Sequence, residues 1–276
     1  MGFTQSLFQD ALDWFLPGAC FCCGNLLPHR DSFGPRHPRA EQLLRYLCPR
    51  CMSRIQLALP TCPCSRPNPN PGASCTLCES LPSVPRPIVS GFIFTNPMDT
   101  LVHALKYNQG RYLVPTLMEL YWDALGMELK RMVSEQQLQL IIPIPLTRSR
   151  RWKRGFNQAE DLALGLADRL GIPCVPHLLK RVKFVQPQAR LQDAAARSQN
   201  VEGAFEVAAL PTDSRRILLI DDVMTTGATL AAASKALHAA GAEYVQASTL
   251  CTAYPATDRR YLFSERCALE LPLLPH

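Results

Sequence analysis

The sequence predicts an α/β fold, in which a mostly parallel sheet carries helices on both faces, with a small cysteine-rich module ahead of it. Over the C-terminal two thirds of the chain, short apolar runs alternate with segments of helical periodicity, a pattern typical of such a sheet. Nine of the twelve cysteines lie between Cys20 and Cys78. We therefore expect an amphipathic helix over residues 1–18, the cysteine-rich module over 19–87 and the α/β domain over 88–276.

The size and composition of the chain limit the classes of protein to which it can belong. Its 276 residues are enough for one sizeable core and a smaller unit. A hydrophobic content of 47% and a charged content of 19% exclude a fibrous or disordered protein. No apolar run reaches the roughly 18 to 20 residues that cross a bilayer, and no basic stretch leads into a signal-type segment. We expect a cytoplasmic protein with no membrane span.

The expected N-terminal helix carries apolar side chains at helical spacing and ends at Pro17-Gly18. It could pack on the chain's own core or lie on a membrane surface. Asp10 and Asp13 favour packing on the core, because anionic lipids would repel their carboxylates.

The α/β domain begins at the first of several predicted strands. Strands are predicted over residues 88–94, 140–144, 216–220 and 244–250, and helices over 97–105, 157–170 and 229–240. Asn157 and Glu160 have the spacing of an N-cap and its capping box. Residues 181–201 have no apolar period, so we expect a long mobile loop there.

The strongest predicted strand runs into a turn that suits a phosphate group. Two carboxylates, Asp221 and Asp222, follow the strand, and a segment of small residues then opens the next helix. Backbone N–H groups at a helix N-terminus lack partners within the helix and lie at the positive end of its dipole. We expect a phosphate monoester to bind the residues of this segment, which are Thr225, Thr226, Gly227, Ala228 and Thr229.

The two carboxylates of this turn suit a ribose. Asp221 and Asp222 can accept hydrogen bonds from vicinal hydroxyls, and we expect them to be the catalytic pair. The whole pattern resembles the fingerprint of the type I phosphoribosyltransferase fold, in which two acidic residues precede such a loop. The alternative is an acidic strand end that caps a helix without a ligand, which is disfavoured because paired buried acids are costly. The turn lacks a Walker lysine, which disfavours a P-loop ATPase.

A basic segment follows the predicted strand at 140–144. Five of the seven residues from Arg148 to Arg154 are cationic. Ligands of open α/β sheets collect beyond the carboxyl ends of the strands, so we expect this segment to face the same crevice as Asp221. Arg154 is the expected pyrophosphate contact, and the alternative is a solvated basic turn. Lys106, at the end of the helix over 97–105, either reaches phosphate or only complements the helix dipole.

The wider region from Arg148 to Arg197 carries eleven Lys and Arg against four Asp and Glu, a local net charge of +7 in a chain whose net charge is +6. Such clustering suits phosphate-bearing partners, although a generally solvated basic face is the alternative. Arg190 and Arg197 lie on the expected loop over 181–201. We expect them to close over a bound ligand, as flexible lids do.

The cysteines of the module occur in pairs with the spacing of metal ligands. The pairs are Cys20 and Cys23, Cys48 and Cys51, Cys62 and Cys64, and Cys75 and Cys78. Two thiolates separated by one or two intervening residues can reach one tetrahedral ion, so we expect one or two structural zinc ions. Which pairs share an ion stays open, and Cys22 could replace Cys20 or Cys23. Disulfides are the alternative, disfavoured because the cytosol keeps thiols reduced.

Several motifs, taken in order, resemble the ComF family. They are the paired cysteines, His103 to Tyr107, Arg154 to Gln158, Gln186 to Gln188, Arg197 to Val201 and Asp221 to Thr229. The resemblance runs from about Cys20 to Cys251 and implies a zinc finger, a phosphoribosyltransferase core, and magnesium with phosphoribosyl pyrophosphate. The family is linked to natural competence and the handling of incoming single-stranded DNA, which implies partners in DNA uptake. The Cys62-Pro63-Cys64-Ser65 segment departs from the usual C-x-x-C-G, and about 25 residues follow Cys251.

Two functions follow from these observations. In the first, the core binds phosphoribosyl pyrophosphate, or another ribose 5-phosphate ligand, with magnesium, and a nitrogen acceptor attacks the sugar. In the second, the surface from Arg148 to Arg197 binds single-stranded DNA or a helicase-like protein without transfer, and either Trp152 or the zinc module supplies stacking or shape. The sequence does not define the acceptor.

Overall fold

The structure is a computed structural model that describes residues 18–27, 46–58, 62–65, 75–107, 110–182 and 203–254. The expected N-terminal helix and the two loop arginines, Arg190 and Arg197, lie outside the described residues.

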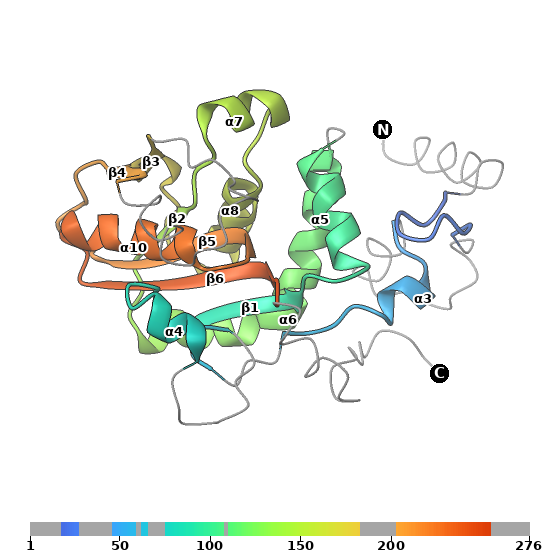
Figure 1. Cartoon of the computed structure of the whole chain (residues 1–276), viewed down its shortest axis with the longest axis horizontal. Coiled ribbons are helices and arrows are strands. Elements are labelled where there is room, and N and C mark those ends of the chain that lie inside the picture. The colour runs from blue at the N-terminus through green and yellow to red at the C-terminus, as the bar shows by residue number, and fades with distance from the viewer. Residues whose placement is uncertain are drawn as a thin grey trace.

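The core is a four-stranded sheet in which every neighbouring pair of strands is parallel (Figure 1). In spatial order the strands are β1 (Ile88–Ile93), β6 (Tyr244–Thr252), β5 (Arg216–Met224) and β2 (Leu140–Pro143). All four lie where the sequence predicts strands. The prediction ended β5 at Ile220, but β6 keeps pairing with β5 as far as Met224, so the strand includes both carboxylates of the turn.

Two small strands form a separate antiparallel pair. They are β3 (Leu179–Arg181) and β4 (Phe205–Val207). β3 takes in Arg181, the first residue of the expected loop, and residues 183–202 lie outside the described part of the chain.

In the part of the chain that the structure describes, two short helices precede β1, and the other helices lie between the strands. In chain order they are α3 (Pro49–Met52), α4 (Thr76–Ser80), α5 (Met98–Lys106), α6 (Val114–Glu135), α7 (Arg148–Arg154), α8 (Gln158–Leu170) and α10 (Ala228–Ala239), with 3-10 turns η2 (Gly110–Leu113) and η3 (Pro176–Leu178). The three predicted helices correspond to α5, α8 and α10 within two residues at each end. For α6 and α7 the sequence analysis predicted no helix.

Apolar side chains cover both faces of the sheet. Along β5, Leu218 and Ile220 belong to one buried cluster, which they share with α5, α6 and α8. Ile217 and Leu219 belong to a second cluster, which they share with α10. Alternate residues of a strand point to opposite faces, so the sheet has helices on both sides, which confirms the predicted fold class.

Short segments pair with both outer strands of the sheet. Gln56 and Ala58, from the cysteine-rich part, form backbone hydrogen bonds with Ile93 and Gly91 of β1. On the other side, the backbone of Ile141 in β2 bonds to Pro173 and Val175. The outer strands therefore have hydrogen-bonding partners along part of their length.

The predicted basic turn is a helix, α7. The Thr147 hydroxyl accepts a hydrogen bond from the backbone N–H of Arg150 at 3.4 Å, and Gly155 ends the helix with a φ of 77°. None of the residues of α7 is buried. Mutual repulsion among five cations disfavours a helix, and these capping contacts offset it.

The predicted capping box is wrong. Asn157 does precede α8 as its N-cap, but its side-chain amide donates to the backbone carbonyl of Ile144 at 3.0 Å rather than capping the helix. Glu160 pairs with Arg151 at 2.7 Å. The buried Asn157 side chain thus holds the end of β2 against the start of α8.

Candidate functional site

Asp221 and Asp222 lie near the carboxyl end of β5, both partly buried. The side chain of each accepts a hydrogen bond from the next backbone N–H, at 2.8 Å for Asp221 and 2.7 Å for Asp222. Successive residues of a regular strand face opposite sides of the sheet, but at this strand end the two carboxylates are close enough to interact with each other. They stand on the same sheet edge as the basic helix α7, as the sequence predicted.

Lys106, the last residue of α5, pairs with Asp222. Its ammonium nitrogen lies 2.8 Å from Oδ2 of Asp222, and both side chains are largely buried. The lysine therefore reaches across to the acidic turn and does more than complement the helix dipole.

Burial and the adjacent charge of Asp222 raise the pKa of Asp221 well above its usual range. The backbone N–H of Asp222 and the charge of Lys106 act in the opposite direction and are outweighed. A carboxyl group in this position holds its proton more tightly than one in water. In the ligand-free site the charged form of Asp221 is therefore disfavoured, and a bound cation or hydroxyl donor would stabilise it.

Replacement of Asp221 by Asn should increase stability at neutral pH. The folded protein keeps the Asp221 proton at pH values where the unfolded chain has lost it, so stability falls as pH rises from the unfolded pKa to the folded one. Asn removes this loss, and we expect thermal unfolding at pH 7 to shift upward by about 2 to 4 °C. At a pH below both pKa values the difference should vanish. A lower melting temperature at pH 7 would contradict the assignment.

The loop after β5 leads into the N-terminus of α10. Gly227 is the N-cap of α10 with a φ of 72°, a left-handed conformation that a glycine adopts without strain. Thr225 and Thr226 are exposed. The hydroxyl of Thr226 accepts weakly from the N–H of Ala228 at 3.4 Å. The first amides of a twelve-residue helix thus follow the two carboxylates after the end of β5 and a short loop.

Arg154 is held beside the carboxylates by two contacts. It donates to the amide oxygen of Gln158 at 3.0 Å, and its guanidinium lies over the ring of Tyr107 at 5.8 Å. Gln158 is itself buried and donates to the backbone carbonyl of Leu105. These contacts link the C-terminal ends of α5 and α7 to the N-terminal end of α8.

A small cavity brings these side chains together, and we name it the acid cavity. Its volume is about 170 Å³. The lining includes Lys106, Arg150, Arg154, Arg181, Asp221, Asp222 and Thr229. Of the residues predicted for the site, Lys106, Arg154, both carboxylates and Thr229 therefore share one cavity. Thr225, Thr226 and Gly227 on the adjoining loop, and Ala228 at the start of α10, are not part of its lining.

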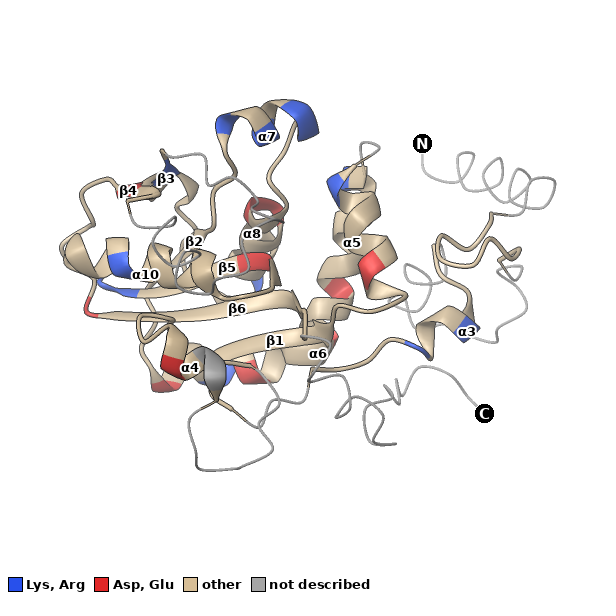
Figure 2. Cartoon of the chain, in the orientation of Figure 1, with Lys and Arg blue, Asp and Glu red and all other residues tan. Residues whose placement is uncertain are grey.

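Two larger chambers adjoin the acid cavity. The α5-side chamber, of about 620 Å³, lies between α5 and α7 and shares Lys106, Arg150 and Arg154 with the acid cavity. The β3-side chamber, of about 660 Å³, lies between α7 and β3 and shares Pro145, Leu146 and Arg181 with it. Figure 2 shows the basic residues of α7 above the carboxyl end of the sheet, with a further cation on β3.

Arg150 and Arg181 line the acid cavity, and neither was assigned to the ribose phosphate site from the sequence. Arg150 lies within the predicted basic segment, so its charge could have assigned it to the ligand site from the sequence. Arg181 lies between two other cations, Lys180 and Lys183, at the start of the expected loop, so its charge alone did not distinguish it from its neighbours. Pairing of β3 with β4 brings it to the cavity.

The paired cysteines gather into two groups of four. Cys20, Cys23, Cys48 and Cys51 form the first group, and Cys62, Cys64, Cys75 and Cys78 form the second. Within each group the sulfur atoms all lie within 4.8 Å of one another. Sequential pairs therefore share a group. The eleven described cysteines are all free thiols, so the disulfide alternative is not what the structure shows.

The sulfur separations fit a tetrahedral ion. Zn–S bonds of about 2.3 Å place the sulfurs of a tetrahedron about 3.8 Å apart. Cys23 and Cys48 are 3.7 Å apart, Cys62 and Cys78 are 3.6 Å apart, and Cys64 and Cys75 are 3.2 Å apart. Four thiolates fill the coordination shell and leave no open position for water, so each group could hold a structural zinc ion.

In each group, one thiol has a lowered pKa. Burial disfavours the thiolates, but hydrogen bonds from backbone N–H groups and neighbouring thiols outweigh it and lower the pKa of Cys20 to about 6 and that of Cys75 to about 7. For Cys20, the backbone N–H of Cys48 donates at 3.3 Å. Cys22, which was a possible substitute ligand, instead directs its thiol to the carbonyl of Pro97 at 3.7 Å.

No helix among the described residues is both long enough and apolar enough to cross a membrane.

Comparisons with known proteins agree with this geometry. The model of the phosphoribosyl transferase domain matches residues 151–268. DNA utilization protein YhgH of Salmonella typhimurium is 32% identical over 206 residues, which cover 74% of this chain and 89% of that protein. Competence protein F of Haemophilus influenzae is 33% identical over 204 residues, or 72% and 87% of the two chains. Competence protein ComFC of Streptococcus pneumoniae is 34% identical over 136 residues, or 49% and 56%.

Proposed function

Because the chain belongs to the ComF family and carries a phosphoribosyltransferase domain, we propose that it binds phosphoribosyl pyrophosphate with Mg²⁺ at the acid cavity and serves in the use of incoming DNA. The observation that carries the proposal is the meeting of Asp221 and Asp222 with Lys106, Arg150 and Arg154 around one small cavity. Carboxylates suit sugar hydroxyls, and fixed cations suit phosphates.

Each part of the ligand has a counterpart. The carboxylates of Asp221 and Asp222 would accept from the two ribose hydroxyls, and the amides after Gly227 would hold the 5-phosphate. Arg154, fixed by Gln158, would hold the pyrophosphate together with Arg150. Carboxylate oxygens are ligands that Mg²⁺ accepts, and the ion would offset charge on the departing pyrophosphate.

The proposed role in DNA use comes from the relatives. Proteins named for competence and for DNA utilization match three quarters or slightly less of this chain at about one third identity. Transfer of the ribose phosphate would connect this core to nucleotide chemistry, because the product of such a transfer to a nitrogen base is a nucleotide.

Calorimetric titration tests the binding directly. With Mg²⁺ present, we expect saturable binding of phosphoribosyl pyrophosphate with a Kd of about 1 to 100 μM, and thermal stabilisation that grows with ligand concentration. Ribose 5-phosphate, which lacks the pyrophosphate contacts, should bind at least about tenfold more weakly. If millimolar phosphoribosyl pyrophosphate gives neither heat nor stabilisation, the proposal fails.

A second candidate function is binding of single-stranded DNA by α7, and one observation favours it. Trp152, which as a large apolar side chain would more often be buried, is 87% exposed and stands among five cations. An exposed ring beside fixed positive charges suits a base that stacks and a phosphate that pairs. Trp152→Ala should then weaken the binding of an oligothymidylate, and affinity should fall steeply with salt. Salt-independent binding, or binding unchanged in the variant, would exclude it.

A further inference from the structure

The two chambers lie on opposite sides of α7. Figure 1 shows α5 on one side of this helix and the β3–β4 pair on the other. The acid cavity, at about 170 Å³, is much smaller than either chamber and adjoins both of them. A sugar held by the two carboxylates could therefore extend substituents toward two separate spaces.

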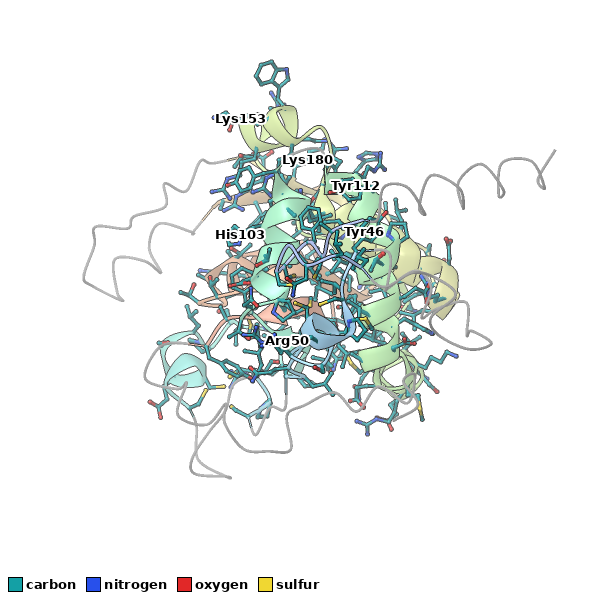
Figure 3. The ribbon with its side chains drawn as sticks, turned by 90° about the vertical axis from the view of Figure 1, so that its right-hand side faces the viewer. Tyr46, Arg50, His103, Tyr112, Lys153 and Lys180 are labelled. Carbon is teal, nitrogen blue, oxygen red and sulfur yellow. The ribbon has the colours of Figure 1, made fainter. Side chains whose placement is uncertain are left out.

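Pyrophosphate belongs in the α5-side chamber. Lys106, Arg150 and Arg154 line both that chamber and the acid cavity, and Lys153 and His103 add positive charge or hydrogen-bond donors farther out. Figure 3 shows Lys153 at the top of the molecule and His103 on α5 below it. With the leaving group on this side, the β3-side chamber stays free for a second ligand.

Arg181 marks the boundary between the acid cavity and the β3-side chamber. Its guanidinium lies 5.4 Å from the ring centre of Phe205, and its buried Nε has no hydrogen-bond partner among the described residues. Burial, and then the nearby charge of Arg150, lower the pKa of Arg181. A half-buried donor without an acceptor is costly, so the surroundings favour an anion at this position.

The rest of the β3-side chamber is also cationic. Arg148, Lys180 and His177 line it together with Arg151, which is already paired with Glu160 at 2.7 Å. Among the described residues of the lining, Glu206 is the only carboxylate. An uncharged purine or pyrimidine would leave these donors without negative charge to face, whereas a ligand that bears a carboxylate or a phosphate would satisfy them.

We propose that the β3-side chamber binds the acceptor of the ribose phosphate and that this acceptor is a small acid, bearing a carboxylate or a phosphate beside a nucleophilic N–H group. This inference rests on the proposed function. The acceptor nitrogen supplies the electron pair of a new bond to C1 of the ribose, the C1–O bond to pyrophosphate breaks, and pyrophosphate leaves with that bond's electron pair. The proton of the acceptor nitrogen passes to solvent.

Matched pairs of compounds test the charge requirement. Orotate against uracil and 2-aminobenzoate against aniline differ by one carboxylate, and adenosine 5′-monophosphate against adenosine differs by one phosphate. Binding would be measured by calorimetry, both with Mg²⁺ and phosphoribosyl pyrophosphate at saturation and without them. We expect at least one acid to bind about tenfold or more tightly than its neutral partner. The pair that shows the effect identifies carboxylate or phosphate as the recognised group. Neutral partners that all bind as tightly as the acids would overturn the proposal.

Matched variants locate the site. Arg148 and Lys180 line only the β3-side chamber, whereas Lys153 lines only the α5-side chamber. The double variant Arg148→Gln, Lys180→Gln should weaken the binding of the acidic acceptor about tenfold. It should change the affinity for phosphoribosyl pyrophosphate by less than threefold. Lys153→Gln should leave the affinity for the acid unchanged. Acid binding that the double variant retains in full would refute the location.

The two proposals fail separately. If phosphoribosyl pyrophosphate does not bind, the proposed function is lost, and the comparison of acids with neutral partners in the ligand-free protein still decides whether the chamber recognises anions. If phosphoribosyl pyrophosphate binds and no acid is preferred, only the inference about the acceptor is lost.

Discussion

Asp222→Asn should weaken the binding of phosphoribosyl pyrophosphate by at least about 100-fold. Hydrogen bonds to a charged group contribute about 1.5 to 3 kcal/mol each, and every 1.4 kcal/mol is about tenfold in affinity. The substitution removes the charge and keeps the shape, so the side chain still offers an oxygen to Lys106, which lies 2.8 Å from the carboxylate. Calorimetry with Mg²⁺ at fixed ionic strength measures the change.

Asp168→Asn is the matched control for this substitution. Asp168 is an exposed carboxylate on α8 and does not line the acid cavity, so its loss should change affinity by less than about twofold. The melting temperatures of both variants show whether they are folded. A folded Asp222→Asn protein that binds within threefold of wild type would remove this carboxylate from the site.

Cys51→Ser should cause the largest loss of stability. Cys51 is buried in the main apolar cluster, which also contains Leu47, Met52 and residues of α5 such as Met98. Structural zinc contributes folding free energy directly, and a missing ligand would also leave a buried hydroxyl in the core. We expect a loss of about 4 kcal/mol, which is about 8 to 16 °C in melting temperature for a protein of this size. Metal analysis should show two zinc ions per wild-type chain and one in the variant.

Cys22→Ser is the matched control, because Cys22 lies beside the first group of sulfurs without belonging to it. Its replacement should leave the zinc content at two and shift the melting temperature by no more than about 3 °C. Cys64→Ser in the second group should also remove one zinc ion. In the described part of the chain, that group packs against only the partly buried Leu81, so removal of its zinc should lower stability by less than removal of the first zinc. Wild-type protein that contains no zinc when purified without chelator would contradict the assignment.

The fold was predictable from the sequence where local patterns and tertiary packing agree. β5 and its two carboxylates followed from an apolar run and the residues after it, and parallel pairing with β6 is what that pattern predicts. The pattern could not show that pairing extends β5 to Met224, because strand ends depend on the neighbouring strand. α7 escaped prediction for a similar reason, since no apolar residue of it is buried and its ends are fixed by Thr147 and Gly155.

The site was predictable in part. Asp221, Asp222, Arg154, Lys106 and Thr229 were expected, and they line one cavity. Their neighbours Arg150 and Arg181 depend on how α7 and β3 are oriented, which the sequence does not encode locally. The roles of all these residues stay predictions until the variants are measured.

The cysteine spacing predicted the ligand pairs but not their grouping. Cys48 and Cys51 could equally have joined Cys75 and Cys78, because spacing fixes only what lies within one turn of backbone. The structure groups pairs that follow one another in the chain.

The covered margins of the sheet limit how another protein could dock. Backbone groups of Gly91 and Ile93 at one margin, and of Ile141 at the other, are already bonded to segments of the same chain. A binding partner could not extend the sheet there by adding its own strand, which is a common and weakly sequence-selective way to associate. Recognition at these margins would have to depend on side chains. Surface substitutions that leave the backbone unchanged could therefore alter which partner binds there.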